Sequence, residues 1–151
     1  MSSVPAFLTF FAMCLGYALV RGGSPERLAG LGMLAALAGS ASVGLITIQG
    51  GFLSVPMRLV AIDLVLALFL TGLSLRANRL WLIGAASCQW LAIAVHLVKL
   101  VHPAIVSTSY AFLTVIWSWP ITALLALGTY AHRQRAASPI PNWRASFHRA
   151  D

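Results

Sequence analysis

Residues 58–73 read RLVAIDLVLALFLTGL and decide the fold class. The run is apolar enough for a transmembrane helix, which needs about 20 mainly apolar residues. Its exception is Asp63. A carboxylate at the centre of a bilayer costs about 2.5 to 3.5 kcal/mol on insertion scales, and less near the interface. Asp63 is therefore expected to have a polar partner, to carry a proton or to contact water.

The composition of the whole chain agrees with a membrane location. Of the 151 residues, 60% are hydrophobic and only 9% are charged, and the mean hydropathy is +0.88. A soluble domain of this length cannot bury so much apolar surface. The net charge of +7 comes from basic residues placed between and after the apolar runs, which favours anionic lipid headgroups over nucleic acid as the partner.

Five segments are long and apolar enough to be helices that cross a bilayer. The sequence predicts them at residues 4–20, 28–48, 56–75, 80–101 and 104–131. The second is preceded by Gly22 and Gly23, with Ser24 predicted as the N-cap residue, Pro25 at the first helical position and Glu26 in the first turn. The predicted fold is an all-α transmembrane bundle over residues 1–131, followed by a basic tail at 132–151.

The basic residues predict the orientation of this bundle. With five crossings, eight of the ten Lys and Arg residues fall on one side, whereas Arg58 and Lys99 fall on the other. The positive-inside rule then places the N-terminus outside and the C-terminal tail in the cytoplasm. In the tail, Arg133, Arg135, Arg144 and Arg149 are expected to contact lipid headgroups. The tail is interpreted either as a disordered basic segment or as one that lies partly on the membrane surface.

Small residues at four-residue spacing predict where helices pack closely, because lipid offers no hydrophobic drive for helices to associate. The predicted packing residues are Gly32, Ala36, Ser40 and Gly44 in the second helix and Gly84, Cys88 and Ala92 in the fourth. Cys88, like Cys14, has no second thiol nearby in the sequence and is interpreted as a packing residue. In the fifth helix, Pro120 lacks an N–H group and is expected to introduce a kink.

Asp63 shares one ridge of its helix with Ala67 and Thr71, so it is expected to face protein. His96, on the next helix, lies at a similar depth, roughly 9 to 10 Å below the outer end at 1.5 Å per residue. Lys99 follows one turn further out. The sequence thus predicts an intramembrane polar cluster of Asp63, His96 and Lys99, with two interpretations. One is an interhelical pair that fixes packing, which we favour, and the other is a proton or ligand site.

Motifs of the common enzyme and cofactor sites are missing from the sequence. It holds no paired carboxylates, no His-x-x-x-His, no Cys-x-x-Cys, no nucleophile elbow and no phosphate-binding glycine loop. His96 is the one histidine well placed within the apolar runs, whereas a bis-histidine haem needs two. We therefore expect no metal, no cofactor and no enzymatic activity.

Three stretches carry a resemblance to known proteins: RGGSPER at 21–27, CQWLAIAVHL at 88–97 and YAFLTVIWSWPITALLALGTYAHRQR at 110–135. Together with Asp63 near the start of the third helix, they resemble a group of small uncharacterised multi-pass membrane proteins of alphaproteobacteria, over most of the chain before about Arg135. The resemblance implies a bacterial inner-membrane location. It assigns no activity and no catalytic or binding residue.

These observations predict a non-enzymatic accessory or scaffold subunit of a larger inner-membrane assembly, with other membrane subunits or further copies of the chain as partners. The alternative is a small proton-coupled transporter or channel that uses Asp63 and His96. A membrane enzyme or sensor of another type is a third hypothesis.

Overall fold

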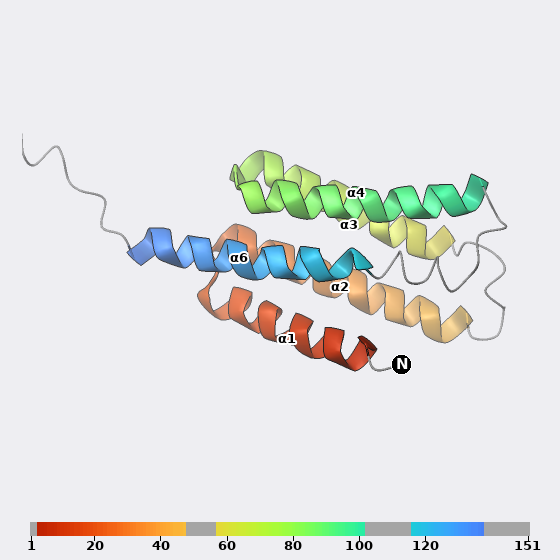
Figure 1. Cartoon of the computed structure of the whole chain (residues 1–151), viewed down its shortest axis with the longest axis horizontal. Helices are drawn as coiled ribbons and strands as arrows, with labels where there is room; N and C mark the ends of the chain where they lie inside the picture. Colours follow the sequence, from red (N-terminus) through yellow and green to blue (C-terminus); the bar gives the residue numbers. More distant parts are fainter. Residues whose placement is uncertain (1–2, 48–56, 102–115, 138–151) are drawn as a thin grey trace, which may run out of the picture.

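The computed structural model describes residues 3–47, 57–101 and 116–137, and within these ranges the chain is helical without any strand (Figure 1). The helices are α1 (Ser3–Arg21), α2 (Ser24–Thr47), α3 (Met57–Ala77), α4 (Leu80–Val101) and α6 (Ser118–Ala137). The predicted all-α class is confirmed.

The first four helices begin and end close to the predicted positions, whereas the last one differs. Residues 104–115 of the predicted fifth helix lie outside the described residues, and α6 runs past Ala131 to Ala137. Hydropathy locates the end of the apolar run and not the end of the helix. The residues after Ala131 are mostly polar but contain no Gly or Pro until Pro139, so the helical backbone continues beyond the apolar part.

Two tight links set the antiparallel arrangement of neighbouring helices. Between α1 and α2, the N–H of Gly22 donates to the carbonyl of Ala18 at 2.9 Å. A Cβ at Gly22 would lie 2.8 Å from Cβ of Glu26, so glycine permits the close approach of the two helix ends. Between α3 and α4, Asn78 takes a positive φ of 48° and donates its N–H to the carbonyl of Ser74 at 3.2 Å, which is a left-handed C-terminal cap.

The five helices lie side by side, and contacts connect α1 with α2, α2 with α3, α3 with α4, α4 with α6, and α6 back to α1. Helix α6 also contacts α2, so it closes the bundle between the first and fourth helices (Figure 1). The links α1–α2 and α3–α4 and the C-terminal end of α6 lie at the same end of the bundle, as Figure 1 shows.

All five helices contribute to one apolar core. Leu70, Leu82 and Leu125, from α3, α4 and α6, are fully buried, and Leu15 of α1 and Met33 of α2 pack in the same cluster. Small residues fill the closest contacts. Ala18, near the end of α1, and Ala29, near the start of α2, are fully buried close to the link between these helices.

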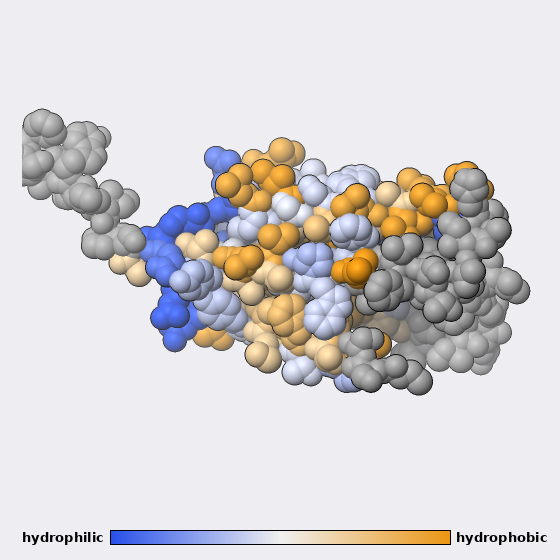
Figure 2. All heavy atoms as spheres, viewed as in Figure 1, coloured by the Kyte–Doolittle hydropathy of each residue, from blue (hydrophilic) through white to orange (hydrophobic). Residues whose placement is uncertain are grey.

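The outer surface of the bundle is largely apolar. Within the described residues, three helices are long and apolar enough to cross a membrane: α1 over Val4–Arg21, α3 over Met57–Ala77 and α4 over Leu80–Lys99. Large side chains such as Met13, Val65 and Leu97 point outward, with exposed fractions of 68%, 68% and 54%. Hydrophilic residues gather at the end where α6 terminates, as Figure 2 shows. This distribution is expected for a protein whose surroundings are hydrocarbon rather than water.

Candidate functional site

The candidate site lies between α3 and α4, which the Asn78 link makes antiparallel neighbours. The ridge of α3 that carries Asp63, Ala67 and Thr71 faces α4: Ala67 is fully buried, and Thr71 Oγ1 accepts a hydrogen bond from Trp90 Nε1 at 3.1 Å. The sequence prediction that Asp63 faces protein therefore agrees with the geometry of its helix.

Both carboxylate oxygens of Asp63 have partners on α4. Oδ2 lies 2.8 Å from Nε2 of His96, and Oδ1 accepts a hydrogen bond from Nε2 of Gln89 at 3.0 Å. The same amide nitrogen is 3.5 Å from the backbone carbonyl oxygen of Asp63. His96 and Gln89 are two turns apart on one face of α4, so the carboxylate contacts α4 at two levels.

Burial is unequal within this cluster. The side chain of His96 is 3% exposed, whereas that of Asp63 is 27% exposed. Lys99, one turn beyond His96 on α4, is also buried at 7%. The structure thus brings Asp63 and His96 together and buries Lys99 one turn further along α4, with the carboxylate as the most accessible of the three.

Gln89 belongs to the site although it lies outside the predicted cluster. Its position, seven residues deeper than His96, predicts a hydrogen bond between helices, and its amide makes that bond to Asp63 itself. The sequence places Ser42, Gln49 and Tyr110 at a depth comparable to that of the cluster. Ser42 is exposed and donates to the carbonyl of Ala38 within its own helix, and Gln49 and Tyr110 lie outside the described residues.

The chemistry open to this cluster is proton binding and hydrogen bonding. A carboxylate opposite an imidazole can share a proton, whereas a metal site needs more ligands than this pair supplies. No group of three or more His, Cys, Asp or Glu side chains comes together among the residues that the structure describes.

The predicted packing residues lie at several helix contacts. A Cβ on Gly32 would overlap the ring of Phe69, which places α2 directly against α3, and a Cβ on Gly84 would lie 3.2 Å from Leu124 of α6. Ala92 is buried, while Ala36 and Cys88 pack against the core from its edge. Ser40 is half-buried. The surroundings of Gly44 lie outside the described side chains.

Other predicted residues lie nearer the ends of the bundle. Pro120 falls in the first turn of α6, which begins at Ser118 after a turn at Trp117. Proline is well tolerated there, because first-turn N–H groups have no partner within the helix. Arg133 and Arg135 are exposed in the last turns of α6. Arg144 and Arg149 lie outside the described residues.

Sequence reasoning missed a buried acidic residue at the basic end. Glu26 is fully buried, and its Oε2 accepts the N–H of Gly23 at 3.1 Å. Gly23 and not Ser24 is the N-cap, since its carbonyl accepts the first helical N–H, from Arg27, at 3.1 Å. Glu26 therefore occupies the N3 position of a capping box. The signal was the three-residue spacing between Gly23 and Glu26.

His132 of α6 packs against the same cap. A Cβ on Gly23 would lie 2.8 Å from Cε1 of His132 and 3.0 Å from Oε2 of Glu26, so only glycine leaves room for both side chains. Oε1 of Glu26 has no hydrogen-bond partner among the described residues. This contact between the start of α2 and the end of α6 depends on the tertiary fold.

Compared with models of known protein families, with curated proteins and with solved structures, the chain has no significant match. The function is therefore inferred from the geometry of this chain.

Proposed function

We propose that the protein is a non-enzymatic integral membrane protein of a bacterial inner membrane, and that it acts as an accessory or scaffold subunit of a larger assembly. The proposal includes five crossings, an N-terminus outside and a C-terminal tail in the cytoplasm. Other membrane subunits, or further copies of this chain, are its proposed partners. The proposed inner-membrane location is the one that the resemblance to small alphaproteobacterial membrane proteins implies.

The observation that carries the proposal is the state of Asp63. Its two carboxylate oxygens contact His96 and Gln89 of the neighbouring helix at 2.8 and 3.0 Å. A polar group that is satisfied by its own chain joins two helices and gives them a defined register. This is what a packing role requires of an acidic residue between two apolar helices.

The charge distribution supports the proposed orientation. Arg21, Arg27, Arg76 and Arg79 flank the two tight links, and Arg133 lies in the end of α6 on the same side of the bundle. Arg58 and Lys99 lie toward the other end. Basic residues concentrated on one side favour a cytoplasmic location for that side.

Purification from native membranes tests the scaffold proposal. The chain would carry a small affinity tag at its chromosomal locus, so that its level stays normal, and would be extracted in mild detergent. Stoichiometric co-purification of the same membrane proteins in independent preparations is the expected result. A homogeneous species that contains only this chain, and that is stabilised by a small solute, would contradict it.

A proton-coupled transporter or channel is the second candidate, and the unequal burial of the pair favours it. Asp63 keeps 27% of its side chain exposed opposite the buried imidazole of His96. A carboxylate in this position can exchange a proton with its surroundings while the imidazole holds it in place.

The substitution Asp63→Asn separates the two candidates. An amide keeps the shape and the hydrogen bonds but does not titrate, so a scaffold should tolerate it, whereas a proton-coupled site should lose its activity. The matched variants Ser40→Leu and Gly44→Leu enlarge the predicted packing ridge of α2, and a scaffold should lose assembly there. The readout is complementation of a deletion strain, with the protein level measured for each variant. An abundant Asp63→Asn protein that fails to complement, beside a ridge variant that complements, would establish the transporter instead.

A further inference from the structure

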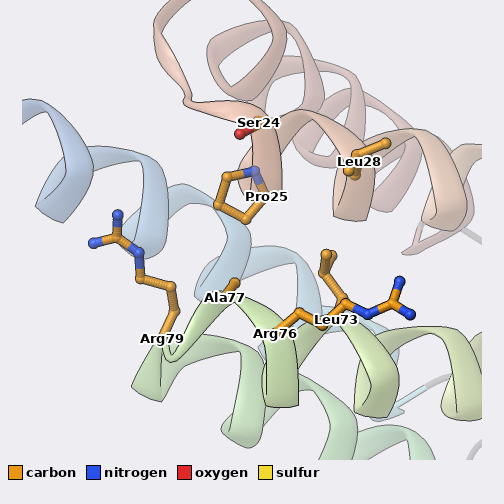
Figure 3. Close-up of a pocket in the computed structure, with 7 residues that line it drawn as sticks. All are labelled: Ser24, Pro25, Leu28, Leu73, Arg76, Ala77 and Arg79. Atoms are coloured by element: carbon orange, nitrogen blue, oxygen red, sulfur yellow. The ribbon is translucent and has the colours of Figure 1, made fainter.

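A groove of about 280 Å³ lies at the basic end of the bundle, between the start of α2 and the end of α3. It is lined by Ser24, Pro25, Leu28, Leu73, Arg76, Ala77 and Arg79. Figure 3 shows Pro25 and Ala77 facing each other, with the guanidinium groups of Arg76 and Arg79 extending to opposite sides of them. Leu28 and Leu73 lie on the side of Arg76, toward the middle of the bundle. The groove thus combines apolar side chains of α2 and α3 with a guanidinium group on either side.

The charges of these two arginines have no carboxylate partner within the described residues. The chain contains only three acidic residues. Asp63 binds His96 and Gln89 in the middle of the bundle, and Glu26 is fully buried with its carboxylate bonded to Gly23. Asp151, the third, lies outside the described residues. An anion for Arg76 and Arg79 must therefore come largely from another molecule.

The start of α2 adds a polar residue, Ser24, and the partial positive charge of a helix N-terminus to the same groove. The first N–H groups of a helix have no partner within the helix, and the partial positive charge there attracts anions. The N–H of Gly23 is already bonded to Oε2 of Glu26, and Pro25 has no N–H. Ser24, which lines the groove, is therefore the residue of this turn that can donate to a ligand there. Ser24 and the two guanidinium groups favour an anionic ligand such as a phosphate group over an apolar one.

We propose that this groove binds an anionic glycerophospholipid. Its phosphate lies beside Ser24 at the start of α2, where the long side chains of Arg76 and Arg79 can reach it from either side, and an acyl chain follows Leu28 and Leu73 toward the middle of the bundle. Basic pockets between helices at the cytoplasmic surface of a membrane commonly bind anionic headgroups in this way. The inference rests on the proposed membrane insertion, and it adds a defined lipid site to the diffuse attraction expected of a basic protein surface.

Native mass spectrometry of the full chain in a neutral detergent tests the site. Phosphatidylglycerol and phosphatidylcholine would be titrated separately against the purified protein. We expect one phosphatidylglycerol molecule to bind first and to be retained at higher collision energy than phosphatidylcholine. In Arg76→Gln/Arg79→Gln this affinity should fall about thirtyfold, since each arginine near a membrane surface contributes about fivefold.

Two matched controls make the result specific. Arg133→Gln/Arg135→Gln removes the same charge at the same end of the bundle outside the groove, and should weaken binding by about threefold or less. Leu28 and Leu31 are both 48% exposed on α2, but only Leu28 lines the groove. Leu28→Gln should therefore weaken phosphatidylglycerol binding more than Leu31→Gln does. The melting temperature of each variant in lipid-free detergent verifies that it is folded.

The outcomes that overturn the site are distinct from those that overturn membrane insertion. If the two arginine double variants lose phosphatidylglycerol affinity equally, the lipid is held by diffuse surface attraction only. If millimolar inorganic phosphate raises the melting temperature of the protein as much as phosphatidylglycerol does, the groove is a phosphate site and not a lipid site. Retention of the protein in the membrane fraction after alkaline extraction measures insertion separately, so a negative lipid result leaves the proposed membrane location intact.

Discussion

Asp63 illustrates how a single polar residue acts within an apolar bundle. Its carboxylate meets His96 at 2.8 Å and Gln89 at 3.0 Å, across the α3–α4 contact. Hydrogen bonds between helices in a membrane stabilise their contact by only about 0.6 to 1.7 kcal/mol. The value is small because the polar groups of separated helices also find hydrogen-bond partners. The contact therefore matters more for choosing the register of two helices than for their total stability.

A double-mutant cycle measures this contact. Asp63→Ala, His96→Ala and the double variant would be compared by thermal unfolding in detergent, and we expect a coupling energy of about 1 kcal/mol between the two positions. Asp63→Ala should lower the free energy of unfolding more than Asp63→Asn does, because the amide of asparagine can still hydrogen-bond His96 or Gln89. Additive effects of the two alanine substitutions would show that the residues are not coupled.

Glu26 carries a second prediction at the scale of one residue. Replacement by alanine removes the acceptor for the Gly23 N–H and leaves a cavity, and should lower the free energy of unfolding by about 1 kcal/mol or more. Glu26→Gln retains an acceptor oxygen of the same shape and should lose less. Melting temperatures of both variants check this. If glutamine is as harmful as alanine, the negative charge itself stabilises the cap, through the helix dipole or His132.

At the scale of the helices, close approach depends on particular glycines. Gly128 of α6 is buried against the indole ring of Trp81 in α4, and a Cβ there would overlap the ring. Trp119 of α6 stacks on Phe10 of α1, with ring centroids 5.6 Å apart. Helix α6 is therefore fixed on two sides, by a small residue against α4 and by aromatic rings against α1.

The glycine contacts predict opposite effects for two similar substitutions. Gly128→Ala should destabilise the bundle by about 1 to 3 kcal/mol, since the Trp81 ring must move within a packed contact. Gly72→Ala is the matched control, because nothing lies within 4 Å of a Cβ at that exposed position of α3. It should be neutral or stabilising by up to about 1 kcal/mol through helix propensity. If the melting temperature of Gly128→Ala equals or exceeds that of Gly72→Ala, the Trp81 ring shifts freely.

At the scale of the whole molecule, the proposed orientation assigns each bundle end to one side of the membrane. Single cysteines would be introduced at Ser2, Gly51, Asn78 and Ser138 in a background without Cys14 and Cys88. A membrane-impermeant maleimide added to intact spheroplasts should label the first two positions and not the last two. Labelling of Asn78 from outside would reverse the arrangement, and would place the basic groove on the outer surface.

The sequence by itself determined the all-helical class, the approximate bounds of four helices and the choice of Asp63 and His96 as neighbours. Apolar length, turn residues and the spacing along a ridge are local properties, and they are visible without the fold. Ser24 was the wrong N-cap by one residue, because glycine and serine can both occupy that position and only the Arg27 hydrogen bond to the Gly23 carbonyl distinguishes them.

Only the tertiary structure decided which distant segments meet. The closure of the bundle by α6, the packing of His132 on the Gly23–Glu26 cap and the groove between Pro25 and Ala77 join residues far apart in the chain. The Gln89 contact with Asp63 belongs to the same class, since the reach of a side chain across a helix contact follows from the rotation of both helices. An apolar helix shows little difference between its faces in sequence, because lipid and protein interior both accept the same side chains. The physical reason is that in a membrane the pattern of hydrophobic residues specifies the environment of a helix but not its neighbours.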